Sequence, residues 1–283
     1  MGSVGRLEQA YAAWETQDWK TAAELLEEVA AEFPDHPGRP AWLFDAALAH
    51  KFSRDWARAY TMGMRAAALV RRGVQEPAYW NLGIAATVLG EWATARDAWR
   101  GFGVDLAPGD GEIVEDFGLT CVRLDEADGS EVVWARRICP TRARVVSIPT
   151  GSERRFGEIV LHDGAPNGER VVGDQTFPVF DEILLWRTSD LPSWTVTVTA
   201  PHGPDLDALV DLFEDRGYCA EPASNTRALC RCCSEGPVDQ ERVVAPGTQL
   251  VWLAGPAAAL DGLLDAWLLA APGRAWADLR SAH

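Results

Sequence analysis

The sequence lacks any run that approaches the roughly 20 consecutive apolar residues needed to span a bilayer. It also lacks the charged and then apolar start of a secretory signal over Met1 to Arg6. We therefore expect a cytoplasmic protein that binds no membrane.

Positive charge is scarce as well. The 283 residues include 26 Lys or Arg against 42 Asp or Glu, a formal net charge of −16. Nucleic-acid binding depends on cationic groups that displace counterions, so we expect no nucleic-acid ligand. An acidic surface favours a basic protein partner, or it serves solubility alone. The hydrophobic fraction of 47% and the 13 Trp residues predict a folded chain.

Motifs of metal binding and catalysis are also missing. There is no Gly-rich phosphate loop, no nucleophile elbow and no helical His-Glu-x-x-His. In a chain without an export signal, the six cysteines should be reduced thiols. Cys230 and Cys233 have the two-residue gap of a zinc pair, but the five histidines are scattered and supply no second pair. We expect no metal and no cofactor, although a metal at the Cys230, Cys232 and Cys233 cluster stays open.

Two places could carry chemistry. His162 and Asp163 could form part of an acid–base pair, but they precede a Gly-Ala-Pro-Asn-Gly turn, where such side chains often bind neighbouring backbone amides. Cys233 could be a reactive thiol beside Arg231, or a packed structural cysteine. In both cases we favour the structural interpretation and predict that the chain is not an enzyme. The alternative is an enzyme or small-molecule sensor whose pocket contains His162, Asp163 and Cys233.

A periodic pattern runs through the first hundred residues. An acidic residue precedes Trp three times, and an alanine follows each Trp by three positions while a small residue precedes it by nine. These positions are Asp18-Trp19, Asp55-Trp56 and Glu91-Trp92, then Ala22, Ala59 and Ala95, then Ala10, Ala47 and Gly83. Such a repeat predicts three helical hairpins, in which the small residues let the two helices approach closely.

The stretches Ala78–Gly83 and Gly90–Ala95 resemble the tetratricopeptide consensus. The predicted helices are Val4–Glu15, Trp19–Glu32, Pro40–Phe52, Trp56–Arg72, Pro77–Leu89 and Trp92–Val104. We expect Leu7, Tyr11 and Trp14, which share one helical face, to be core residues. The groove of such a solenoid holds a peptide or a partner's loop, or else the repeats act only as a rigid lid on the next domain. In the groove, the candidate partner-binding residues are Trp42, Asp45, Trp80 and Glu91.

The remaining chain predicts an α+β fold, with domains at 1–108 (helical repeats), 109–190 (β-rich) and 191–283 (α/β). Short runs between turns predict a small curved sheet or partial barrel. These strands are Glu131–Ile138, Arg144–Ile148, Glu158–Leu161 and Trp194–Ala200. The last segment adds the helix Leu206–Arg216, the strand Gln249–Leu253, the helix Ala257–Leu269 and a strand over Arg274–Leu279. Two βαβ-like halves predict a ferredoxin-like region.

Three segments together resemble tetratricopeptide-containing immunity proteins encoded beside bacterial toxins of the type VI secretion or polymorphic-toxin kind. They are Tyr79–Ala85, Val160–Gly168 and Cys232–Gly236. The family motif falls on His162, Asp163, Gly164, Cys233, Ser234, Glu235 and Gly236. Histidines usually follow the Cys-Ser-Glu-Gly stretch in the family, whereas this chain continues with Pro237.

The resemblance implies a protein that binds a cognate toxin domain, often a nuclease, and blocks it in the producing cell. Net charge agrees, since a nuclease presents cationic groups that an acidic inhibitor can occupy. The sequence does not indicate the oligomeric state or the binding face.

Overall fold

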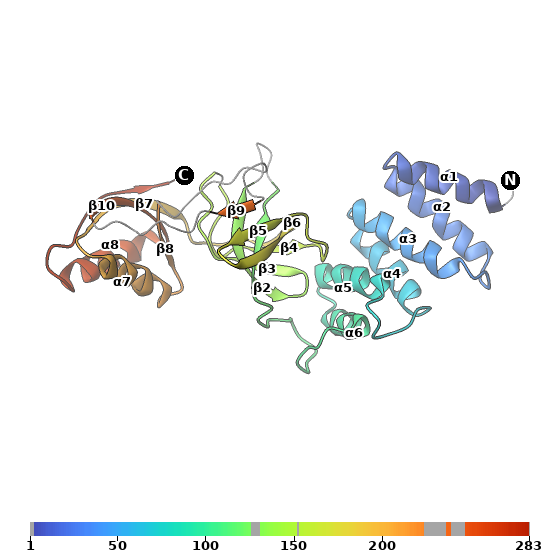
Figure 1. Cartoon of the computed structure of the whole chain (residues 1–283). Coiled ribbons are helices and arrows are strands. Elements are labelled where there is room, and N and C mark those ends of the chain that lie inside the picture. The colour runs from blue at the N-terminus through green and yellow to red at the C-terminus, as the bar shows by residue number, and fades with distance from the viewer. Residues whose placement is uncertain (1–2, 126–130, 152, 224–235, 239–246, 283) are drawn as a thin grey trace. The chain divides into compact units, whose positions relative to one another are not determined.

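The protein is described from a computed structural model that covers residues 3–125, 131–151, 153–223, 236–238 and 247–282. It is an α+β protein with two compact units, Met1–Ile113 and Val114–His283 (Figure 1). The second unit contains both segments that the sequence analysis separates at residue 190. Among the described residues, no helix combines the length and apolarity required to traverse a bilayer.

The described part of the first unit consists of six helices arranged as three successive hairpins, drawn from blue to cyan in Figure 1. Each predicted helix is present, with ends that differ by at most five residues. The helices are α1 (Ser3–Glu15), α2 (Trp19–Glu32), α3 (Arg39–Phe52), α4 (Trp56–Ala67), α5 (Pro77–Leu89) and α6 (Trp92–Phe102).

The turn inside each hairpin repeats the same geometry. A residue with left-handed backbone comes first: Gln17 (φ 59°), Arg54 (φ 58°) and Gly90 (φ 74°). The acidic residue follows as the N-cap of the second helix. The Thr21 N–H donates to Asp18 Oδ1 at 3.2 Å, and the Arg58 N–H donates in the same way to Asp55. The acidic step is therefore a helix start signal.

The third hairpin shows why small residues recur. A Cβ added at Gly83 of α5 would lie 2.6 Å from the ring of Trp99 in α6, and one at Gly101 would lie 2.5 Å from the ring of Tyr79. Each glycine makes room for an aromatic ring of the other helix. The predicted close approach is thus confirmed for this hairpin.

The second unit begins with a small closed barrel. Strand β1 pairs with β2, β2 with β3, β3 with β4 and β4 with β6, all antiparallel, and β6 then pairs with β1 in parallel. In an up-and-down ring of five strands the first and last run the same way, so a parallel pair closes it. The strands are β1 (Leu119–Arg123), β2 (Val132–Cys139), β3 (Arg142–Val145), β4 (Ile159–His162) and β6 (Gln175–Arg187).

Strand β6 extends beyond the barrel. Its first residues pair with β5 (Glu169–Val172), and β5 also pairs in parallel with β9 (Gly236–Val238). The core of the barrel includes Val122, Val133, Ala143 and Val160. The predicted small curved sheet or partial barrel is confirmed, but the strand Trp194–Ala200, which was predicted as part of it, lies instead in the four-stranded sheet described next.

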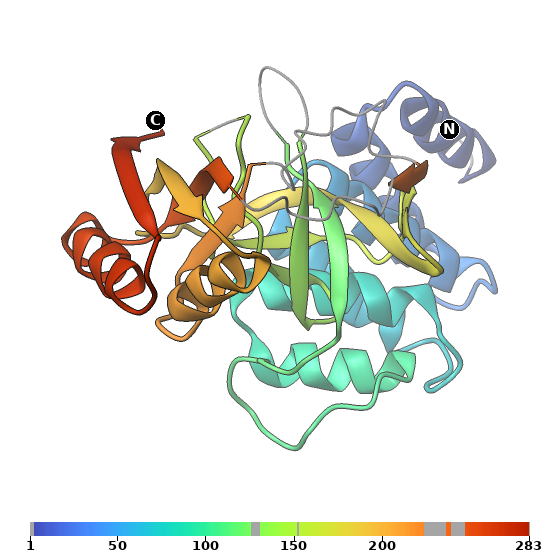
Figure 2. The same cartoon turned by 60° about the vertical axis from the view of Figure 1, so that its left-hand side comes forward.

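The unit continues with a four-stranded sheet covered on one face by two helices (Figure 2). Its strand order is β11-β7-β10-β8, and the strand pairs are antiparallel. Phe213 and Trp267 from the helices pack on this face, whereas Cys219 and Trp252 cluster with Ile148 and Phe156 of the preceding segment. The elements are β7 (Ser193–Ala200), α7 (Gly203–Glu214), β8 (Cys219–Pro222), β10 (Gly247–Ala254), α8 (Ala257–Leu269) and β11 (Ala275–Ser281).

Candidate partner-binding site

The first helices of the three hairpins are joined by two polar contacts. The Tyr11 hydroxyl of α1 donates to Asp45 Oδ2 of α3 at 2.8 Å. The Lys51 ammonium of α3 donates to Asn81 Oδ1 of α5 at 3.0 Å. These contacts place α1, α3 and α5 side by side, so that they contribute to one surface.

Aromatic side chains remain open on this surface. Tyr11 is 39% exposed and Phe52 is 45% exposed. Trp14 lies edge-on to Trp19, with ring centroids 5.2 Å apart, and Phe52 is 4.8 Å from Trp19. We name Tyr11 and Trp14 of α1 and Phe52 of α3, with Trp19 from the start of α2, the α1/α3 aromatic cluster. Exposed aromatic rings are the side chains that most often anchor a protein partner.

Carboxylates border the cluster. Glu8 and Glu15 are exposed on α1, and with Tyr11 they line a shallow depression of about 470 Å³. Asp45 is half-buried, and this burial raises the pKa of its carboxyl. Burial and the neighbouring Asp45 likewise raise the pKa of the Tyr11 hydroxyl, which therefore stays a hydrogen-bond donor. The surface combines apolar anchors with negative charge.

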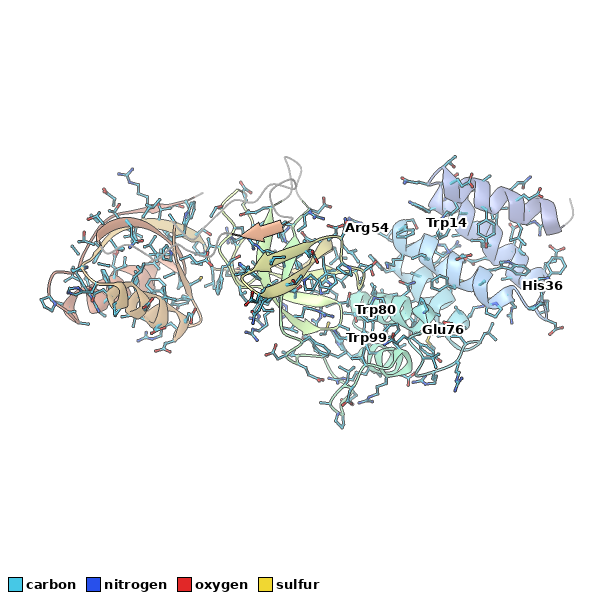
Figure 3. The ribbon with its side chains drawn as sticks, viewed as in Figure 1. Trp14, His36, Arg54, Glu76, Trp80 and Trp99 are labelled. Carbon is cyan, nitrogen blue, oxygen red and sulfur yellow. The ribbon has the colours of Figure 1, made fainter. Side chains whose placement is uncertain are left out.

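The four predicted partner-binding residues differ in their burial and in their neighbours. Trp42 is only 8% exposed, stacks on His36 at 4.6 Å and belongs to the core of the first unit, so it is not a surface anchor. Trp80 is half-buried beside Trp99, with ring centroids 4.9 Å apart (Figure 3). Glu91 is exposed as the N-cap residue of α6. Asp45 alone contacts the α1/α3 aromatic cluster.

The cluster itself was not predicted as a binding site. Leu7, Tyr11 and Trp14 were expected in the core because they share a helical face. Leu7 and Trp14 do pack against core residues, but Tyr11 is exposed. Phe52 ends the predicted helix Pro40–Phe52 and precedes a polar turn, which is a signal that it lies at the rim of the core.

His162 is completely buried in the barrel. Its ring stacks on Phe180 at 4.6 Å, and its Nδ1 lies 2.7 Å from the carbonyl oxygen of Asp163. Burial lowers the pKa of His162 to about 4, so the ring is neutral near pH 7. Asp163 accepts a hydrogen bond from the Gly164 N–H at 2.6 Å. Asp163 therefore binds a neighbouring backbone amide, as the turn interpretation predicts, and burial leaves the His162 ring inaccessible to a substrate.

The other half of the family motif is only partly described. Cys233, Ser234 and Glu235, like Cys230 and Cys232, lie outside the described residues. Gly236 begins β9 and pairs with Arg170 of β5. The described cysteines, Cys121, Cys139 and Cys219, are buried free thiols.

Negative charge is unevenly distributed. The first unit has 16 acidic and 11 basic residues, and the second has 26 and 15, so their net charges are −5 and −11. Helices α7 and α8 contain no Lys or Arg. Their outward side chains form a second acidic surface: Asp207, Asp211, Glu214, Asp261 and Asp265. Asp205 of the same helix pair is buried and pairs with Arg274 at 2.9 Å.

No protein-family model and no curated protein matches the chain. A solved structure that matches is that of a hypothetical protein from Neisseria gonorrhoeae, with 13% sequence identity and a TM-score of 0.24. The match covers 58% of this chain and 92% of that chain. A similarity this low carries no argument about fold or function.

Proposed function

We propose that the chain is a cytoplasmic, non-enzymatic binding protein that neutralises a basic toxin domain, in the manner of an immunity protein. The observation that carries the proposal is the α1/α3 aromatic cluster, bordered by Glu8, Glu15 and Asp45. A nuclease domain is the partner class that fits best, since its active site must present cations to phosphate.

The two properties of the surface act at different stages of binding. The net charge of −16 accelerates the encounter with a basic partner, and this steering weakens as salt increases. Tyr11 and Phe52 supply apolar area that a partner can bury, which slows dissociation. An acidic inhibitor of this kind associates quickly because of its charge and dissociates slowly because of a few buried aromatic contacts.

The finer fold assignments are part of the proposal. Three hairpins with a common turn geometry support a tetratricopeptide-like solenoid, whose first helices line its inner surface. The four-stranded sheet and its two helices follow the order strand-helix-strand-strand-helix-strand when β9, which pairs with β5, is set aside, and this order supports a ferredoxin-like sandwich. Neither fold implies an activity by itself.

Burial of His162 supports a binding role over the alternative enzyme. A general base must reach the proton that it removes, whereas this ring is covered by Phe180 and is 0% exposed. The His162 and Asp163 pair therefore acts within the barrel as a structural turn.

The test is co-purification of the full chain with the product of the adjacent upstream gene, followed by binding kinetics at low and high salt. We expect a complex whose association slows as salt rises. Phe52→Ala and Tyr11→Ala should each weaken it by at least about tenfold, the effect of losing one anchor. Leu269→Ala is the matched control, because Leu269 is 81% exposed but lies in the second unit.

The possible outcomes test separately the proposed function and the proposed binding surface. If no complex forms at low salt, the proposed function is wrong for this neighbour. If a complex forms but the two aromatic variants bind like Leu269→Ala, another surface holds the partner.

A further inference from the structure

The second unit contains a cavity of about 350 Å³ that the proposed function does not use. Strand β2 contributes Trp134, strand β5 contributes Arg170 and strand β8 contributes Cys219 and Glu221. Ile148 and the residue before β2, Glu131, complete the part of the lining that matters here. The volume lies in the range of small-molecule sites.

Arg170 is a buried cation for which the described part of the chain supplies no anion. It is 6% exposed, and its guanidinium lies 4.7 Å from the centroid of the Trp134 ring. Its Nη1 lies 3.8 Å from the Cys121 thiol, and its Nε has no hydrogen-bond partner in the described part of the chain. Among the described residues, no carboxylate pairs with it. A buried guanidinium is normally paired, so this site has an unused capacity to bind an anion.

Glu221 presents the opposite charge to the same cavity. Its Oε2 accepts a hydrogen bond from the Ile148 N–H at 3.1 Å. Burial, reinforced by the nearby Glu131 carboxylate, raises the pKa of Glu221 to about 7. Glu131 is engaged elsewhere, since its two oxygens accept the backbone N–H groups of Thr150 and Gly151. Among the described residues, no cation stabilises the charged form of Glu221.

We propose that this cavity binds a small zwitterion of the α-amino-acid type, with its carboxylate on Arg170 and its ammonium group on Glu221. A simple anion would pair with Arg170 but meet Glu131 and Glu221. A simple amine would pair with Glu221 but meet Arg170. A zwitterion satisfies both groups, and Trp134 with Ile148 offers apolar contact to its side chain.

Binding should be coupled to protons. The charged or titratable groups that share the cavity with Glu221 are Glu131, Glu214, Cys219 and Arg170. An ammonium group beside Glu221 favours its carboxylate, so at pH 6 binding should release up to about one proton.

The experiment is isothermal titration calorimetry of the full chain with each of the common L-α-amino acids, at pH 6, in two buffers that differ in ionisation enthalpy. We expect at least one to bind, with a heat that depends on the buffer. Its N-acetyl and carboxamide derivatives, which lack one charge each, should bind at least about tenfold more weakly.

Two variants test the assignments. Arg170→Gln and Glu221→Gln should each weaken binding by about tenfold or more, and Glu221→Gln should also abolish the proton release. Glutamine at position 221 keeps an oxygen for the Ile148 N–H, so this variant decides the matter if Arg170→Gln fails to fold. Arg136→Gln is the control, because Arg136 is an exposed residue of β2 that pairs with Asp116.

The proposal is overturned if no amino acid binds, if the singly charged derivatives bind as well as the parent, or if Glu221→Gln binds with unchanged affinity. These outcomes leave the proposed function intact, since that function depends on Tyr11 and Phe52 in the first unit.

Discussion

Substituting Gly83 by alanine should destabilise the first unit, although alanine is the better helix former. A Cβ at this position would lie 2.6–2.7 Å from three atoms of the Trp99 ring. That ring is 0% exposed and has Trp80 packed edge-on against it, so it cannot move aside cheaply. Overpacking costs about 1–3 kcal/mol and often more, while the glycine-to-alanine exchange returns at most about 1 kcal/mol. We expect a net loss of about 1–2 kcal/mol.

The matched control is Gly262→Ala in α8, where nothing lies within 4 Å of the added Cβ. This variant should gain up to about 1 kcal/mol. The assay is urea denaturation of each variant, together with amide hydrogen exchange of the α5 and α6 peptides to locate the loss. In a Trp99→Leu background, Gly83→Ala should cost much less, because the ring that it meets is gone. If Gly83→Ala instead raises stability as Gly262→Ala does, the close approach of the two helices is refuted.

Three further predictions concern the second unit. For His162, the folded pKa of about 4 lies below the ordinary value of 6.5. Its contribution to the free energy of unfolding is therefore fully present above pH 6.5, and up to about 3 kcal/mol of it is lost as pH falls to 4. In urea titrations at several pH values, His162→Gln should remove this loss. For Glu221, the folded pKa of about 7 lies above the ordinary value of 4.5. Its contribution to the free energy of unfolding is therefore fully present below pH 4.5 and is lost as pH rises to 7. In the same titrations, the stability of Glu221→Gln should fall more steeply than that of the parent as pH is lowered from 7 to 4.5. Arg154→Met should lower the free energy of unfolding by about 3–5 kcal/mol, because it removes the ion-pair partner of the buried carboxylates of Glu158 and Glu182. The measurement is thermal or urea unfolding, and a loss below about 1 kcal/mol would contradict this account.

The helices of the first unit were predictable because the sequence signals that define them are local. The acidic N-cap and the small residues recur within each hairpin, so a pattern of about 37 residues suffices to find them. Most of the C-terminal strands and helices were also predicted, because each is a short apolar or amphipathic run bounded by turn residues. Confirmed elements include α7, α8, β10 and β11.

Strands β1, β5 and β6 escaped prediction because their stability comes from distant partners. Strand β6 contains Pro178 and the adjacent acids Asp181 and Glu182, which obscure its alternation. Asp181 is bound by Arg123 of β1, and Glu182 is held by Arg154. Both arginines are far away in sequence, so no short window reveals that these carboxylates have partners. The local pattern therefore does not show the regular alternation of a strand.

The predicted partner-binding residues differ from the α1/α3 aromatic cluster for a related reason. Whether a tryptophan is an anchor or a core residue depends on which neighbouring helix covers it. Trp42 and Trp14 both lie on first helices of hairpins, yet Trp42 is sealed by His36 and the core, whereas Trp14 packs at the edge beside the exposed ring of Phe52. Sequence spacing fixes the face of a helix but not how far the next helix extends across it.

Negative charge and the exposed aromatic cluster are concentrated in different units of the molecule. Most of the net charge, −11 of −16, lies in the second unit, whereas the exposed α1/α3 aromatic cluster lies in the first. Long-range attraction acts over the Debye length, which is about 10 Å at 0.1 M salt and about 30 Å at 0.01 M, while dissociation depends on the apolar contacts formed at the end. Under the proposed function, neutralising Asp207, Asp211 and Asp261 together should therefore slow association at low salt and leave the dissociation rate unchanged. Removal of Phe52 should do the reverse, because a single ring contributes nothing to the field but much to the contact.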